Sequence, residues 1–285
     1  MKKLFNRHFE ITIYFVYLFC GLFVLYQGRS CGLFAPPQVG MDQLSMLECA
    51  SNLCRGQFPD SAYRYSYAYT LFLAFLHMLS GGSLLWMRIL QLAVCSLIPV
   101  FIYRTARLLK VGKTAGQIGA ICYLFYGPAM LISLDFLRAA PLALLFLLFV
   151  YFLLLAWRLR SDRHFIYVGG LGAFCILGRE NFAAVVPAVL LLWLFPAFRK
   201  RVKWSAVVGY VLALFLPVLG VMLLNYIWFD SFQPVPGNAG NVLGFYHGKD
   251  TIEHFGTLTL TLIQSVPVQF CNFLSSYELE NSGNL

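Results

Sequence analysis

A few ionisable side chains in this chain stand apart from its charge clusters, and these are the residues that could carry out chemistry. Fourteen of the 21 Lys and Arg residues form four short clusters, at residues 2–7, 104–113, 158–163 and 199–203. The seven basic residues outside these clusters are Arg29, Arg55, Arg64, Arg88, Arg138, Arg179 and Lys249. Ionisable groups close to long apolar segments are costly, so they are candidates for binding or catalysis.

Asp42 is the foremost acidic candidate. It follows the first apolar segment and stands at the start of a predicted helix that runs to about Leu53 and is ended by Gly56 and Pro59. Capping of that helix is the simpler alternative to a role in chemistry, because Asp is a preferred N-cap residue. Glu48, six residues further on, is expected to face elsewhere.

Other charged residues come in close pairs. Asp135 and Arg138 are three residues apart, so they form either an i,i+3 ion pair or an anion site that uses Arg138. Arg179 and Glu180 lie at a predicted helix break, where they could be a satisfied pair. His247 and Lys249 lie on a glycine-flanked turn, for which a solvated loop is the alternative to a role in binding.

The sequence gives little support for a metal site. Asp42 together with Glu48 or Asp135 could hold Mg²⁺, but one carboxylate with scattered partners is a weak pattern for this ion. No Cys and His spacing in the sequence is typical of zinc. We therefore expect no cofactor.

The composition indicates a membrane protein. The 285 residues are 60% hydrophobic and only 12% charged, with a mean hydropathy of +0.72, whereas a soluble domain has about 25% charged residues. The net charge of +9 does not indicate nucleic-acid binding, because the positive residues gather next to apolar segments, as membrane topology and anionic lipid headgroups require.

Seven apolar segments are predicted to span the membrane, at residues 11–27, 84–103, 115–132, 139–157, 165–177, 182–195 and 205–226. The expected fold is an all-α, polytopic transmembrane helical bundle. Positively charged loops stay in the cytoplasm, so the four basic clusters place the N-terminus inside and Asp42 outside.

The segments outside the membrane are expected to be long. The loop 28–83 is predicted to carry interfacial helices, because Ser66 to Leu79 is apolar and aromatic-rich but too short to span. In this loop Cys49 and Cys54 could form a disulfide, or either could pair with Cys31. We expect two parts, a membrane module over residues 1–226 and a Gly/Pro-rich outer segment over residues 227–285.

Several short motifs, taken in order, resemble one family of membrane enzymes. They are residues 37–42, 65–74, 88–91, 103–107, 126–128, 137–138, 178–182, Asn225 and the glycine-rich 240–248. Their order and spacing resemble the GT-C-type membrane glycosyltransferases, specifically bacterial relatives of the dolichyl-phosphate-mannose protein mannosyltransferases and of the lipid A aminoarabinose transferase.

The resemblance implies transfer of a sugar from a polyprenyl-phosphate carrier to a lipid, glycan or protein acceptor, at the outer face of a bacterial inner membrane. It implies that Asp42 is the general base of an inverting reaction. The growing charge of the leaving phosphate needs fixed cations. The candidates are Arg138 and Arg179, followed by Arg64, His247 and Lys249, with Glu48, Asp135 and Glu180 as possible acidic partners.

The sequence also departs from the family pattern. Tyr67 and Thr70 replace common prolines, and Gln43 follows Asp42 where many members have a second acid. The chain stops at Leu285, soon after a motif (277–281) that resembles a mid-protein feature, so we expect a truncated product, a fragment or a minimal variant. A non-catalytic membrane subunit, a degenerate transferase or a transporter is the alternative function.

Overall fold

The fold is built from helices, with no strand, across the part of the chain that the computed structural model describes. That part comprises residues 7–32, 34, 36–37, 42–57, 66–179, 181–199 and 202–229. The described helices belong to one compact unit, Met1–Pro236. The predicted all-α class is therefore confirmed. The predicted outer segment 227–285 lies, from residue 230 onward, outside the described residues.

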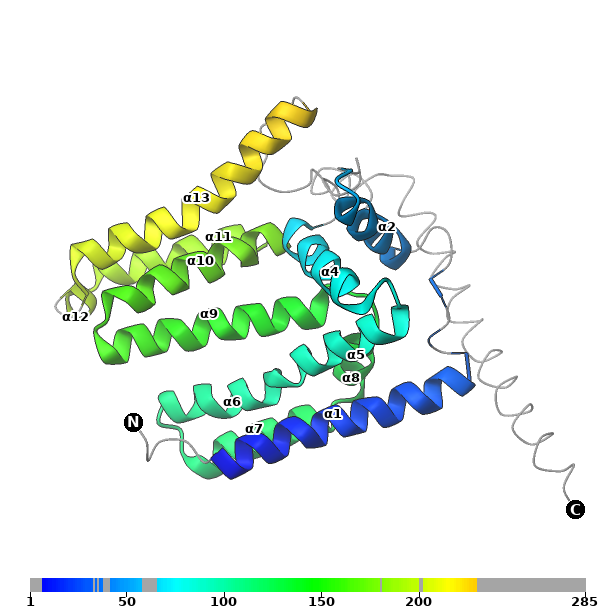
Figure 1. Ribbon diagram of the computed structural model, residues 1–285. Coiled ribbons are helices and arrows are strands. Elements are labelled where there is room, and N and C mark those ends of the chain that lie inside the picture. The colour runs from blue at the N-terminus through cyan, green and yellow to red at the C-terminus, as the bar shows by residue number, and fades with distance from the viewer. Residues whose placement is uncertain are drawn as a thin grey trace, which may run out of the picture. The chain divides into compact units, whose positions relative to one another are not determined.

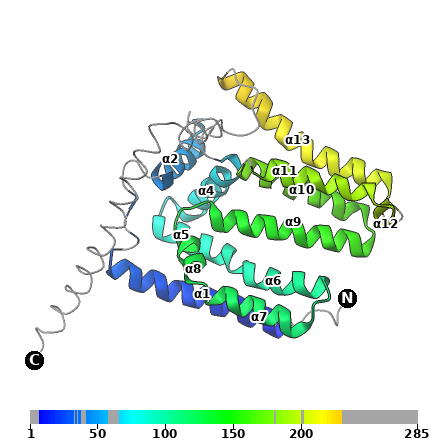
Figure 2. The same cartoon turned by 180° about the vertical axis from the view of Figure 1, so that it is seen from behind.

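Long apolar helices form the body of the bundle. They are α1 (Arg7–Ser30), α5 (Leu84–Cys95) continued by α6 (Leu97–Leu108), α9 (Ala139–Leu159), α10 (Asp162–Gly178) and α13 (Trp204–Phe229). Figure 1 shows these helices running alongside one another, from α1 at one edge to α13 at the other, and Figure 2 shows the same order from behind. Four of them, counting α5 and α6 as one, are long and apolar enough to cross a membrane.

The predicted span over residues 115–132 is bent in the structure, and whether it crosses the membrane as one span stays a prediction. The structure divides this segment into α7 (Lys113–Leu124) and α8 (Gly127–Leu134), which are bent by 62° relative to each other. Pro128 lies in the first turn of α8, where a missing N–H is tolerated. Because Pro128 has no N–H to donate to the carbonyl of Leu124, α7 cannot continue through this position, and a new helix begins there.

The two shortest predicted spans do form helices. Residues 165–177 fall in α10, which has 17 residues and is at the lower limit of length for a span. Residues 182–195 form α11 (Phe182–Ala188) and a 3₁₀ turn over Val189–Leu194. Within the described residues at most five segments pass as spans, and only if the bent α7–α8 pair counts as one. The count of seven stays a prediction.

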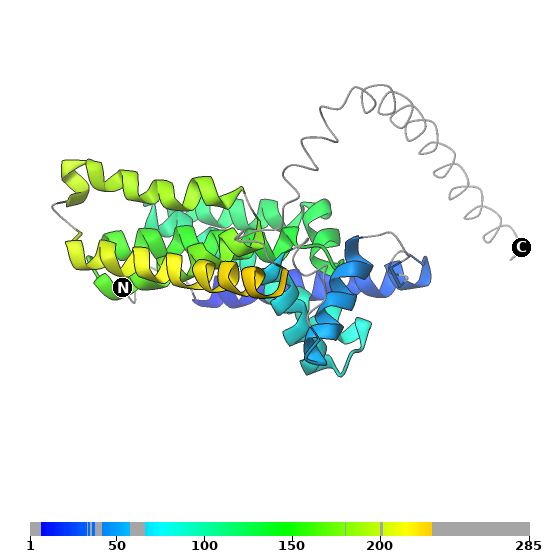
Figure 3. The same ribbon diagram turned by 90° about the horizontal axis from the view of Figure 1, so that it is seen from above.

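The basic clusters gather at one end of the bundle. Their described members lie where α1 begins, at the α6–α7 and α9–α10 turns, and at α12 (Pro196–Arg199), which precedes α13. These points fall at the same end in Figure 1. The opposite end carries α2 (Asp42–Cys54) and α4 (Tyr67–Ser80), as Figures 1 and 3 show. This separation agrees with the predicted topology, whereas the side of the membrane stays a prediction.

The helix α10 is held close to its neighbours by small residues. A Cβ added to Gly169 would overlap the backbone carbonyl of Tyr210 in α13 and lie 2.9 Å from the Cβ of Ala213. A Cβ on Gly172 would meet the side chains of Val186 and Phe149. Glycine therefore lets α10 pack between α9 and α13 with backbones in near contact.

The predicted helix that starts at Asp42 is present as α2. Asp42 was predicted to be the N-cap and is instead the first helical residue, a difference of one position. The helix ends before Gly56, whose φ of 73° suits glycine. Among the described residues, no disulfide joins Cys31, Cys49 and Cys54, and Sγ of Cys54 donates to the carbonyl of Ala74 at 3.4 Å.

Candidate functional site

The helix α2 lies on α4 through an apolar face. Met46 and Ala50 of α2 are buried against Leu73 of α4 and against Phe136, in the loop that joins α8 to α9. Asp42, at the start of α2, is exposed. This packing leaves the first turn of α2 beside the α8–α9 loop and leaves the carboxylate of Asp42 accessible.

A hydrogen bond ties the first turn of α2 to Asp135. Nε2 of Gln43 donates to Oδ2 of Asp135 at 3.2 Å, and the N–H of Phe136 donates to Oδ1 at 2.8 Å. Asp42 and Asp135, both predicted site residues, are thus brought into the same region although they are far apart in sequence. Glu48 is also exposed on α2. It lies about 240° around the helix from Asp42, because six residues at about 100° each turn it away.

Arg138 and Arg179 lie at the same end of the antiparallel pair α9 and α10. Arg138 is the N-cap residue of α9, and Arg179 follows the last residue of α10. The N–H of Leu142, one turn into α9, donates to the carbonyl of Arg138, and a Cβ on Gly178 would overlap the side chain of Leu142. Arg138 is half-buried and Arg179 is exposed. The two cations therefore flank the N-terminal end of α9, where the helix dipole also favours anions.

The N-terminus of α4 is attached to this end of α10. Oγ of Ser66 accepts a hydrogen bond from the N–H of Tyr69 as the helix cap and donates to the carbonyl of Gly178 at 2.9 Å. Tyr67 donates through its hydroxyl to Asn225 of α13, which is fully buried. The first turn of α4 thus joins α10 and α13 next to Arg179.

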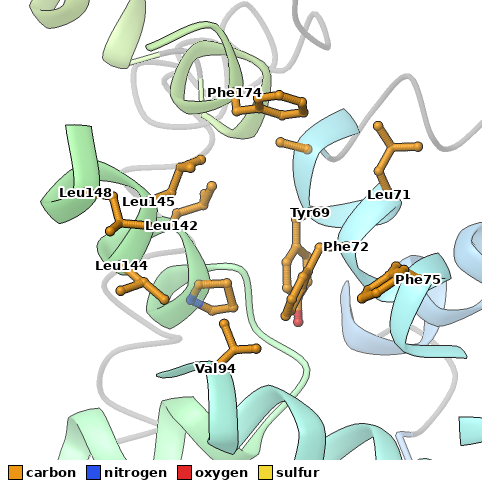
Figure 4. Close-up of a pocket in the computed structure, with 12 residues that line it drawn as sticks. Tyr69, Leu71, Phe72, Phe75, Val94, Leu142, Leu144, Leu145, Leu148 and Phe174 are labelled. Atoms are coloured by element: carbon orange, nitrogen blue, oxygen red, sulfur yellow. The ribbon is translucent and has the colours of Figure 1, made fainter. Parts of the chain in front are cut away.

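An apolar pocket lies next to the polar region around Arg138 and Arg179. It has a volume of about 400 Å³ and lies between α4 and α9, with Val94 of α5 and Phe174 of α10 completing its wall (Figure 4). Its lining on α9 begins at Pro141 and Leu142, three and four residues after Arg138, and continues to Leu148. The lining on α4 runs from Ala68 to Phe75. We call this space the α4–α9 groove.

Four of the predicted site residues cannot be placed. Arg64, Glu180, His247 and Lys249 lie outside the described residues. Within the described part of the chain, no three His, Cys, Asp or Glu side chains come together as metal ligands.

The sequence reasoning missed several buried polar residues next to the site. Gln91 in α5 and Ser133 in α8 are fully buried, and Tyr69 in α4 is almost so. Burial raises the pKa of the Tyr69 phenol well above its ordinary value, so it stays protonated and donates to Gln91. The signal that could have found Gln91 is a glutamine in the middle of an otherwise apolar segment.

Taken together, the bundle and its site define a multi-pass membrane protein in which two arginines, Arg138 and Arg179, lie next to an apolar groove. A family model described as dolichyl-phosphate-mannose-protein mannosyltransferase matches residues 66–220, which is more than half of the chain. The chain belongs to this family and is a membrane glycosyltransferase of the GT-C type. The search of curated proteins and the search of solved structures each returned no match. Arg138 and Arg179 lie inside the matched residues, and Asp42 lies before them.

Proposed function

We propose that this protein transfers a sugar from a polyprenyl-phosphate donor to a hydroxyl group of a lipid, glycan or protein acceptor at the outer face of the membrane. The observation that carries the proposal is the α4–α9 groove, which starts within one helical turn of Arg138. An apolar groove next to fixed cations suits a substrate with a long apolar chain and a phosphate head. A nucleotide sugar has no such chain.

The two arginines would hold the phosphate of the donor. Arg138 and Arg179 lie at the same end of α9 and α10, and an arginine fork matches phosphate oxygens with two donors at once. Negative charge grows on the phosphate as the bond to the sugar breaks. Cations already in place stabilise that charge more in the transition state than in the bound substrate.

Asp42 would act as the general base. Its carboxylate takes the proton of the acceptor hydroxyl while that oxygen bonds to the anomeric carbon. The bond from this carbon to the phosphate oxygen breaks at the same time, and polyprenyl phosphate leaves with the electron pair. Attack from the side opposite the leaving group inverts the anomeric centre. The exposure of Asp42 supports this role, because an acceptor can reach it.

The family name supports the donor class, since it names a dolichyl-phosphate sugar and a protein acceptor. For this chain we propose the bacterial cell membrane, with the N-terminus in the cytoplasm and the site on the outer side. The gathering of basic clusters at the opposite end from α2 and α4 supports that orientation.

The test compares donors. Membranes containing the protein receive either a radiolabelled polyprenyl-phosphate sugar or the corresponding nucleotide sugar, and label in the acceptor fraction is counted. We expect transfer from the lipid-linked sugar and none from the nucleotide sugar when lipid carrier synthesis is blocked. Transfer from the nucleotide sugar alone, or no transfer from either by well-folded protein, would overturn the proposal and favour a non-catalytic subunit.

A further inference from the structure

The helix α5 carries two buried polar side chains on one face. Arg88 is 6% exposed and Gln91 is 0% exposed, and their spacing of three residues places them on the same side of the helix. Polar groups buried in an apolar helix are costly unless they are hydrogen-bonded. Their contacts therefore indicate what this face of α5 is for.

Arg88 is attached to two segments near the site. Its Nη1 donates to the carbonyl of Phe34 at 2.5 Å, and its guanidinium lies over the rings of Phe34 and Phe136, at 5.4 and 4.9 Å from their centres. Phe136 directly follows Asp135. The arginine thus connects α5 to the segment after α1 and to the α8–α9 loop.

Gln91 uses both hydrogens and the oxygen of its amide. Nε2 donates to the carbonyl of Asp135 at 2.5 Å and to the carbonyl of Ser133 at 3.2 Å, and Oε1 accepts from the hydroxyl of Tyr69 at 3.1 Å. A methionine of about the same size supplies no hydrogen and a buried glutamic acid supplies only one, so the contacts require this amide and not only its volume.

These bonds form a chain that ends at Gln43, the residue after Asp42. Gln91 holds the backbone at Asp135, the carboxylate of Asp135 accepts from Gln43, and Gln43 is next to Asp42. The network also reaches α1, because the hydroxyls of Tyr17 and Ser133 lie 3.1 Å apart. A buried network with its groups satisfied fixes one geometry.

We propose that Gln91 is a positioning residue: it fixes the α8–α9 loop, and through Asp135 and Gln43 it fixes the first turn of α2 that carries Asp42. It does not touch the reacting atoms. The effect on turnover rests on the proposed function, whereas the effect on the structure of α2 does not.

The first experiment measures hydrogen exchange of backbone amides in the purified full chain. Gln91→Met is compared with Ser96→Ala, a matched control that removes another fully buried polar group of the same helical segment, whose hydroxyl donates to the carbonyl of Leu92 in its own helix. We expect Gln91→Met to speed exchange at residues 42–54 and 133–138 at least fivefold. Exchange in α9 and α13 should stay as in wild type.

The second experiment measures turnover in a double-mutant cycle. Gln91→Met and Gln43→Leu should each lower kcat about 10- to 100-fold, because small misplacement of a reacting group has costs of this size. KM for the donor should stay within about twofold. Since both variants break the same chain of bonds, the double variant should be little worse than the poorer single one.

Each outcome decides something different. Unchanged exchange at residues 42–54, or multiplied effects in the double variant, overturns the positioning role. Absence of transfer by wild type overturns the proposed function, while the exchange data still decide whether Gln91 fixes α2. If Gln91→Met fails to fold, Gln91→Glu keeps the volume and the acceptor for Tyr69, but as a buried, protonated acid it donates at most one hydrogen. It should still speed exchange at residues 42–54, and wild-type exchange there overturns the positioning role.

Discussion

At the scale of single residues, charge alone pointed to part of the candidate site. Arg138, Arg179, Asp135 and Asp42 stand out in the sequence because they lie outside the basic clusters and next to apolar segments. Their grouping at one end of the bundle follows from the alternating direction of the helices. The contact between Gln43 and Asp135 could not be predicted, since it depends on how α2 lies on the α8–α9 loop.

The proposed phosphate contacts give a prediction at this scale. Arg138→Gln and Arg179→Gln should each raise KM for a polyprenyl-phosphate donor and lower kcat/KM about 10- to 100-fold. A hydrogen bond between charged groups contributes about 1.5–3 kcal/mol. Initial rates over a range of donor concentrations measure this effect. Arg163→Gln, which changes an exposed arginine at the opposite end, is the control and should leave kcat/KM unchanged. Equal loss in all three variants would contradict the assignment.

At the scale of elements, the sequence predicted where most helices lie but not how two of them are broken. The Gly127-Pro128 step between α7 and α8 carried a local signal that the apolar pattern of residues 115–132 concealed. The break between α5 and α6 at Ser96 carries a similar signal, because Pro99 has no N–H to donate to the carbonyl of Cys95. The side chain of Ser96 donates to the carbonyl of Leu92 there. The apolar pattern also does not predict the ion pair between Arg104, in a basic cluster, and Glu10 of α1, in which Nη2 and Oε2 are 2.6 Å apart.

The close approach of α10 and α13 gives a prediction at this scale. Gly169→Ala should lower the midpoint of thermal unfolding in detergent, because the new methyl group meets backbone that cannot move aside, at a cost of about 1–3 kcal/mol. Gly170→Ala is the matched control. A Cβ at Gly170 meets no atom within 4 Å, and alanine is the better helix former, so stability should be unchanged or slightly higher. A Gly169 variant as stable as the Gly170 variant would refute the close packing.

At the scale of the whole molecule, the basic clusters and the candidate site lie at opposite ends of the bundle. Basic clusters lie at one end, while α2, α4 and the candidate site lie at the other (Figure 1). The α4–α9 groove reaches from the site end into the apolar body of the bundle. Composition and charge predicted the separation of the ends, because both are properties of the sequence. The groove could not be predicted, since it depends on the packing of four helices.

Filling the groove gives a prediction at this scale. Leu145→Trp should raise KM for a long-chain polyprenyl donor at least tenfold, because the larger side chain fills the space in which we propose that the lipid binds. A donor with a short, water-soluble chain should be affected less. Leu216→Trp, on the exposed face of α13, tests for a general effect of tryptophan and should change neither value. Equal effects on long- and short-chain donors would show that the groove does not hold the lipid.

The most direct test of the account is sugar transfer by wild type, Asp42→Asn and Glu48→Gln at matched expression. The two variants each remove one exposed carboxylate from the same helix, so they differ in position and not in kind. With a labelled polyprenyl-phosphate sugar, we expect Glu48→Gln to transfer label at the wild-type rate and Asp42→Asn to be slower by about 10²–10⁴-fold, the usual contribution of a general base. Transfer by Asp42→Asn at the wild-type rate would contradict the account.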